Sequence, residues 1–222
     1  VELGNHNKSQ YYFKKVIRIQ ERLFGKKSSN VAESLNEIGE IYYDAILYNM
    51  AMRYFKSSLD VYGEVYNKSD HQDIGMVYWN LGNLYSDLQQ YIFAEKAYKS
   101  SLDVYKKTVG ELHSDYAGCL SSTGLFYMDI SDYEQSKKYL EKALTLYKMM
   151  DVDNYEISSV YTNLGILYSE IGQYEDVEKM YQRALEIDKK YLDGNNSDYA
   201  SGLNNLGIYY QDMGDYLRAE KY

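Results

Sequence analysis

The chain has 222 residues, with 24 Lys and Arg against 33 Asp and Glu, so its formal net charge is −9. This balance disfavours RNA and DNA as partners, because nucleic-acid affinity depends on cationic side chains that neutralise phosphates. The single cysteine excludes an internal disulfide framework, and no apolar run approaches the roughly 20 residues that span a bilayer. The sequence therefore predicts a cytoplasmic protein with no membrane-spanning segment.

Five glycines divide the chain into repeats. They lie 41 to 43 residues apart, at Gly39, Gly82, Gly124, Gly165 and Gly207, and each is followed by a tyrosine three residues later and by a second tyrosine nine residues later. Self-similarity at a fixed period is typical of solenoids, in which each repeat buries its apolar face on its neighbours and the product is an extended surface. The repeats favour a binding function, and we expect most of the tyrosines to pack in the core or between repeats.

Apolar residues within each repeat follow the helical period of 3.6, which predicts a shorter helix A followed by a longer helix B. Residues 1–23 are predicted to be the tail of a preceding repeat in a single all-α solenoid that covers residues 1–222. The predicted helix pairs that follow are 30–66, 73–108, 115–149, 156–191 and 198–222, the last of them incomplete.

Loop residues support these boundaries. Gly172 and Gly214 lie between helices A and B, where a left-handed residue commonly ends a helix, and Asp132 and Asp215 then fall in N-cap position. The expected caps of helix A are Ser29–Asn30, Ser114–Asp115 and Ser197–Asp198.

One set of residues carries a family resemblance: Tyr78, Leu81, Gly82, Tyr85, Ala94, Tyr98 and Ser101. This constellation resembles the tetratricopeptide repeat, and the resemblance covers nearly the whole chain. A period near 42 and the stretch 110–117 are similar to the longer, kinesin-light-chain-like subclass, although His71-Gln72-Asp73 and His113-Ser114-Asp115 lack the proline of its His-Pro-Asp linker.

The resemblance implies a right-handed superhelical solenoid of antiparallel helix pairs, with helix A on a concave wall. It also implies a non-catalytic scaffold that binds a peptide or a partner helix in that groove. Similar arrays precede caspase-like protease domains, so the alternative is a regulatory or sensor array of a larger enzyme.

Groove residues follow from helix geometry, because positions three before, one after and five after each repeat glycine share a stripe opposite the packed face. A second set stands two residues before the glycine and resembles an asparagine ladder that binds peptide backbone. The predicted groove residues are Asn36, Trp79, Asn80, Asn83, Leu125, Asn163, Ile166, Asn204, Asn205 and Ile208. Intra-array hydrogen bonds are the alternative for the ladder, and partial burial is the alternative to a binding hot spot for Trp79.

An acidic edge completes the predicted groove, at Asp44, Asp87, Asp129, Glu170 and Asp212. These carboxylates lie in the last turn of helix A, where the helix dipole disfavours negative charge. The predicted partner is a protein or peptide with basic and apolar side chains. A solvated helix end, or hydrogen bonds to the start of helix B, would also explain the row.

Catalytic, metal and cofactor sites are not indicated. His71 and His113 have no neighbouring residues at metal-ligand spacing, and Cys119 has no recognisable histidine partner. No phosphate loop, dinucleotide fingerprint or nucleophile elbow is present.

The chain begins and ends within repeats, so apolar helix faces are expected at both ends. Tyr12, Phe13 and Ile17 are expected to be exposed at one end, and Leu206, Tyr209 and Tyr210 at the other. Such faces predict end-to-end self-association.

Overall fold

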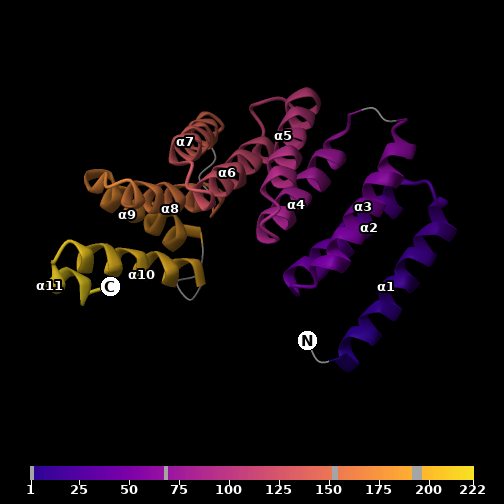
Figure 1. The fold of residues 1–222 in the computed structure, drawn as a ribbon, viewed down its shortest axis with the longest axis horizontal. Coiled ribbons are helices and arrows are strands. Elements are labelled where there is room, and N and C mark those ends of the chain that lie inside the picture. Colours follow the sequence, from indigo (N-terminus) through magenta and orange to yellow (C-terminus); the bar gives the residue numbers. More distant parts are fainter. Residues whose placement is uncertain (1–2, 68–69, 152–154, 192–196) are drawn as a thin grey trace. The chain divides into compact units, whose positions relative to one another are not determined.

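The computed structural model describes residues 3–67, 70–151, 155–191 and 197–222, and within these ranges it contains helices and no strand (Figure 1). The chain divides into two compact units, Val1–Gly110 and Glu111–Tyr222. Each unit is a stack of antiparallel helix pairs, so the fold is an all-α solenoid. A single continuous array from end to end stays a prediction.

Unit 1 contains α1 (Leu3–Phe24), α2 (Ser29–Asp44), α3 (Tyr48–Val65), α4 (Gln72–Asp87) and α5 (Tyr91–Thr108). The A helices are α2 and α4, and each packs mainly against the B helix that follows it. The B helix α1 packs on α2. Small and aromatic side chains fill the core of this unit, among them Ala32, Ala51, Phe55 and Tyr62.

Unit 2 contains α6 (Ser114–Asp129), α7 (Tyr133–Met149), α8 (Tyr155–Glu170), α9 (Tyr174–Tyr191), α10 (Ser197–Asp212) and α11 (Tyr216–Ala219). The A helices are α6, α8 and α10. Fully buried side chains such as Leu120, Leu140, Leu164 and Leu206 form its core.

Repeat glycines lie where helix A meets helix B most closely, as the sequence predicts for four of the five. A Cβ atom built on Gly39, Gly82, Gly124 or Gly165 would lie 2.5–2.7 Å from the side chain sixteen residues later, which is Phe55, Tyr98, Leu140 or Tyr181. Gly207 is different, because its nearest neighbours would be 3.8 Å and 3.9 Å away. The position sixteen residues after Gly207 falls beyond Tyr222.

The two predicted caps of B helices, Asp132 and Asp215, are confirmed, and the caps of α2 and α6 lie one residue earlier than predicted. Asp132 accepts a hydrogen bond from the backbone N–H of Gln135. In contrast, α2 is capped by Ser28, and α6 by the Nδ1 atom of His113, which accepts from the backbone N–H of Asp115 at 3.2 Å. An imidazole nitrogen that carries no proton can therefore act as the N-cap acceptor, the role that the prediction gave to serine. The predicted cap at Ser197–Asp198 lies outside the residues whose side chains the structure describes.

Tyrosines follow the prediction at one repeat position and depart from it at the other. Tyr42, Tyr127, Tyr168 and Tyr210, three residues after their glycines, are buried. The tyrosines nine residues after the glycine begin helix B at the edge of the stack, so several are exposed: Tyr91, Tyr174 and Tyr216. The expectation of packing in the core or between repeats is wrong for these three, whereas Tyr48 and Tyr133 are half-buried.

The predicted apolar ends are also only partly observed. Tyr12 is exposed, but Phe13 is half-buried because its ring packs edge-on against Tyr42. At the other end the expectation is wrong for Leu206 and Tyr210, which are 0% and 2% exposed. The Tyr210 ring stacks on Tyr222, and α10 packs against α9. End-to-end self-association stays a prediction.

The loop between helices A and B requires one left-handed residue, and the repeats fill this position differently. Gly172 and Gly214 have φ of 72° and 74°, as predicted, but the same position holds Ile46 at 60°, Gln89 at 56° and Ser131 at 61°. A β-branched side chain is strained in this conformation. Ile46 is 71% exposed, so its side chain gains little from packing.

Exchanging these residues should therefore change stability in opposite directions. We expect Ile46→Gly to raise the free energy of unfolding by about 0.5–1 kcal/mol, and Gly172→Ile to lower it by about the same amount. Urea titrations of the two variants and the wild-type chain measure both effects. A loss of stability in Ile46→Gly would contradict the left-handed geometry of this loop.

Candidate peptide-binding surface

The A helices differ from the rest of the chain in charge. None of the 24 Lys and Arg residues lies within α2, α4, α6, α8 or α10. The same five helices contain Glu33, Glu37, Glu40, Asp44, Asp73, Asp87, Asp115, Asp129, Glu156, Glu170, Asp198 and Asp212. We call their exposed side chains, within each unit, the A-helix surface. The sequence shows this charge pattern once the helix boundaries are known. It was not predicted, because the sequence was compared one position at a time, at fixed distances from each repeat glycine.

In unit 1, amide side chains join the two A helices. Asn80 on α4 donates to Glu40 Oε1 at 2.7 Å and to Asn36 Oδ1 at 3.1 Å, and Asn36 itself donates to Glu40 at 2.8 Å. Asn36 is only 5% exposed. The asparagine ladder had two interpretations, binding of peptide backbone and hydrogen bonding within the array. For Asn80 the structure shows hydrogen bonding within the array.

Two further predicted residues of unit 1 are also tied to the array. Asn83 accepts a hydrogen bond of 2.8 Å from the Tyr98 hydroxyl on α5. Trp79 is half-buried, and its Nε1 atom is shielded from solvent without a hydrogen-bond partner among the described residues. The indole is therefore neither a fully exposed hot spot nor a fully satisfied core residue.

The acidic edge of unit 1 is exposed at Asp44 and Asp87. Asp87 Oδ2 accepts hydrogen bonds from the hydroxyls of Tyr43 at 2.7 Å and Tyr48 at 3.2 Å. Burial and this carboxylate raise the pKa of Tyr43, so the hydroxyl stays protonated and continues to donate. Tyrosine donors from the preceding helix pair thus partly offset the unfavourable position of Asp87.

In unit 2, the predicted asparagines make fewer side-chain hydrogen bonds within the array than those of unit 1. Leu125, Ile166, Asn163 and Asn205 are half-buried, whereas Asn204 and Ile208 are exposed. No hydrogen bond joins the side chains of the three asparagines to another residue in the part of the chain that the structure describes. The acidic edge, Asp129, Glu170 and Asp212, is exposed throughout.

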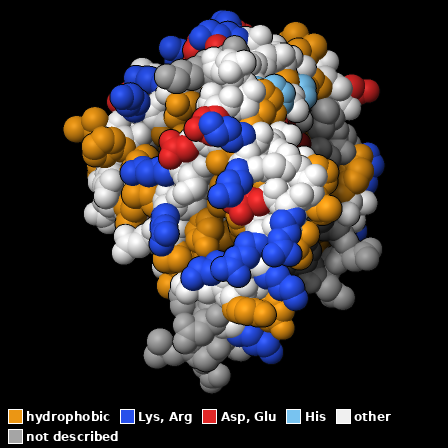
Figure 2. Space-filling view, turned by 90° about the vertical axis from the view of Figure 1, so that its right-hand side faces the viewer, with side chains coloured by type: hydrophobic (Ala, Val, Ile, Leu, Met, Phe, Trp, Pro, Cys, Tyr) orange, Lys and Arg blue, Asp and Glu red, His pale blue; other side chains and the backbone are white. Residues whose placement is uncertain are grey.

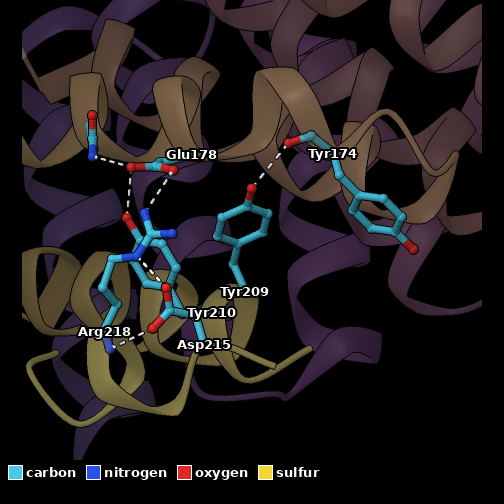
Figure 3. Close-up of polar contacts among 7 residues, drawn as sticks. Tyr174, Glu178, Tyr209, Tyr210, Asp215 and Arg218 are labelled. Atoms are coloured by element: carbon cyan, nitrogen blue, oxygen red, sulfur yellow. Dashed lines mark hydrogen bonds and ion pairs between the residues drawn. The ribbon is translucent and has the colours of Figure 1, made fainter. Parts of the chain in front are cut away.

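A polar cluster holds α10 in place beside α9 (Figure 3). The Tyr210 hydroxyl donates to Glu178 at 2.7 Å, and the Tyr209 hydroxyl donates to the backbone carbonyl of Tyr174 at 3.2 Å. Arg218 lies 3.6 Å from Glu178 and 2.6 Å from Asp215. These contacts fix the orientation of the α10 face that carries Asn204 and Ile208.

His71, His113 and Cys119 have structural positions. His71 and His113 cap α4 and α6 through Nδ1, and Cys119 is buried in α6. In the described ranges, no three His, Cys, Asp or Glu side chains are placed to hold a metal ion. None of the helices described is both long and apolar enough to cross a membrane.

Comparison with solved structures places this fold among known repeat proteins. BtubC (BKLC) from P. vanneervenii is similar with a TM-score of 0.80 at 20% identity, over 97% of this chain and 85% of that chain. A putative kinesin light chain with nearly identical TPR-like repeats from P. anserina has a TM-score of 0.69 at 15% identity, over 85% and 90%. A Rap protein complexed with Competence and Sporulation Factor has a TM-score of 0.68 at 18% identity, over 95% and 60%. At these identities the likeness shows a shared fold.

A search of curated proteins found no match. A family model described as tetratricopeptide repeat matches residues 1–64, 73–149, 120–190 and 156–222. These matches cover most of the chain and agree with its repeat glycines, its helix pairs and its kinesin-light-chain-like neighbours, so the chain belongs to the tetratricopeptide repeat family.

Proposed function

We propose that this chain is a non-catalytic protein-interaction scaffold whose A-helix surface binds a basic segment of a partner protein. The observation that carries the proposal is the absence of Lys and Arg from all five A helices. Burial alone does not explain it, because the same helices keep exposed carboxylates such as Asp129 and Glu170. A surface with one sign of charge attracts the opposite sign and excludes like-charged partners.

Helix geometry strengthens this attraction. The exposed acids at the end of each A helix add to the negative end of the helix dipole, so the two fields have the same sign. A Lys or Arg side chain from a ligand would relieve the repulsion between them. An acidic ligand would meet repulsion from the exposed acids within either unit.

Unit 2 provides the groups that an extended peptide requires. An amide side chain offers both a donor and an acceptor, so Asn163 and Asn205 can bind peptide backbone without reading its side chains. Leu125, Ile166 and Ile208 supply apolar contact beside them. In unit 1 the role of Asn36 and Asn80 is different, because their hydrogen bonds position α2 against α4.

A peptide titration tests the charge. We expect a fluorescent peptide of alternating Lys and Leu to bind the wild-type chain, and Asp129→Asn/Glu170→Gln to weaken binding by about tenfold while flattening its salt dependence. The matched control is Glu134→Gln/Glu175→Gln, which removes the same charge from the exposed first turns of α7 and α9. Equal weakening by both pairs would reduce the effect to net charge and contradict the proposed surface.

The amides give a separate signature. Asn163→Ala/Asn205→Ala should weaken the Lys-Leu peptide and an uncharged Gln-Leu peptide by the same factor, because main-chain hydrogen bonds carry no side-chain information. If neither Asn163→Ala/Asn205→Ala nor Asp129→Asn/Glu170→Gln weakened binding, the binding site would not lie on the A helices.

The proposal also includes a compartment. Cys119 is buried and is the only cysteine of the sequence, so the chain has no internal disulfide. This is compatible with the reducing cytoplasm, and we propose that the protein acts there.

A further inference from the structure

The B helix α1 has the opposite charge character to the A helices. Residues 8–27 contain Lys8, Lys14, Lys15, Arg18, Arg22, Lys26 and Lys27, and their one acidic residue is Glu21. Lys and Arg side chains gather on the face of the molecule on which α1 lies (Figure 2). In a chain with a net charge of −9, this local excess of cations requires a separate explanation.

A cavity of about 450 Å³ lies within unit 1, between α1, α2 and α3. Apolar side chains line part of it, including Ile17, Leu35 and Met50. Three cations line it as well: Lys14 and Arg18 from α1, and Arg53 from α3. No Asp or Glu is among the described residues that line it. The cavity therefore combines an apolar lining with three positive charges, and its volume falls in the range of ligand-binding pockets.

No described residue neutralises these three cations. None of Lys14, Arg18 and Arg53 makes an ion pair or a side-chain hydrogen bond with another residue of the described ranges. All three side chains are exposed. Some exposed lysines of unit 1 do have partners, as in the pairs Lys27–Glu64 and Lys107–Asp70, whereas others, such as Lys56, have none among the described residues. Like charges around one cavity repel, and a bound anion would remove that repulsion.

Comparison between repeats shows that the charge of this pocket is not a general property of the B helices. When the repeats are aligned on Tyr12-Phe13 and Tyr54-Phe55, the residue equivalent to Arg18 is Asp60, and in the next repeat it is Asp103. In those repeats the aspartate at the position of Arg18 balances part of the positive charge of the neighbouring lysines and arginines. The pocket beside α1 has a third cation in place of that acid.

We propose that this pocket binds an organic phosphate, that is, a phosphomonoester joined to an apolar or aromatic group. A phosphomonoester carries a charge of about −1.5 to −2 at pH 7 and has three strong acceptor oxygens, which matches several cations better than one carboxylate does. The guanidinium groups of Arg18 and Arg53 suit bidentate contacts with phosphate. The apolar side chains of Ile17, Leu35 and Met50 would receive the ester group. This site is separate from the A-helix surface and does not depend on the function proposed for it.

The test is a titration of the whole chain with phenyl phosphate, followed by calorimetry and by NMR chemical shifts. Saturable binding is expected, with Arg18→Gln and Arg53→Gln each weakening it by about tenfold. The matched control is Lys15→Gln, which removes the same charge from the neighbouring residue of α1 but does not line the cavity. It should change the affinity less than twofold. Circular dichroism of each variant checks that the helices are intact.

Three outcomes would overturn the proposal: no saturable binding of phenyl phosphate, equal weakening by Lys15→Gln and Arg18→Gln, or benzoate binding as tightly as phenyl phosphate. A second titration distinguishes two sources of the phosphate, a phosphorylated protein and a free metabolite. A phosphotyrosine peptide that binds more tightly than phenyl phosphate would assign the pocket to a phosphorylated partner protein, whereas equal or weaker binding would assign it to a free phosphorylated metabolite. Both results support a phosphate pocket.

Discussion

Replacing Gly165 by leucine should lower the free energy of unfolding by about 3 kcal/mol or more, and even Gly165→Ala should lower it by about 1–2 kcal/mol. The reason is the contact between α8 and α9. A Cβ atom on Gly165 would lie 2.5 Å from Cε1 and 2.7 Å from Cδ1 of Tyr181, whose ring is 5% exposed and has little room to move. The helices would have to separate, which loses contacts along the pair.

Gly207 provides the matched control, because it occupies the same repeat position without the ring. A Cβ atom there would meet nothing closer than 3.8 Å. Alanine has a helix propensity about 1 kcal/mol better than that of glycine, so Gly207→Ala should leave the 222-residue chain as stable as wild type or up to about 1 kcal/mol more stable. Denaturant titrations measure both substitutions. If Gly165→Ala were as harmless as Gly207→Ala, the glycine packing described for unit 2 would be wrong.

Alkaline pH should destabilise unit 2 strongly through its buried tyrosines. Burial and the nearby Glu141 carboxylate raise the pKa of Tyr168 to about 12. Burial and the charge of Glu170 do the same for Tyr181, and burial and the hydrogen bond to Glu178 do so for Tyr210. In the unfolded chain, a tyrosine has a pKa of about 10.

The sign of the effect follows from proton binding. Between pH 10 and 12 the folded chain holds these protons and the unfolded chain releases them, so rising pH favours unfolding. Below pH 10 both states are protonated and these groups add no pH dependence. A pKa difference of two units lowers the free energy of unfolding by roughly 1.4 kcal/mol per tyrosine at pH 11, or roughly 4 kcal/mol for the three together. Urea titrations at pH 8, 10 and 11 measure this loss.

Tyr168→Phe isolates one of these tyrosines. At pH 8 the variant should be less stable than wild type by about 1 kcal/mol, because the hydrogen bond from Tyr168 to Glu141 is absent. By pH 11 the difference should disappear or reverse, since phenylalanine has no proton to release. Lysines also titrate in this range, and the comparison of the two chains cancels their contribution. Parallel curves for the two chains would contradict the raised pKa.

The sequence by itself determined the repeat, the helix pairs and the family, because these depend on local information. The spacing of the repeat glycines, the 3.6-residue apolar period and the loop signals act within about 20 residues, so each repeat reports the same pattern independently. The charge contrast between the A helices and α1 was equally present in the sequence, since it needs only helix boundaries and a count of charged residues. The sequence also predicted the left-handed backbone of Gly172 and Gly214, because glycine is the residue that most readily adopts it.

Only the tertiary structure decided which side chains are available to a ligand. Asn80 and Asn163 occupy the same repeat position, yet Asn80 is bound by Asn36 and Glu40, about 40 residues earlier in the chain, whereas Asn163 has no such contact among the described residues. The difference comes from the preceding repeat, not from the residue's own neighbours in sequence. The cavity beside Arg18 likewise exists because α1, α2 and α3 pack together. A repeat pattern predicts where a side chain starts on its helix, but its hydrogen-bond partners and its exposure depend on what the adjacent repeat places opposite it.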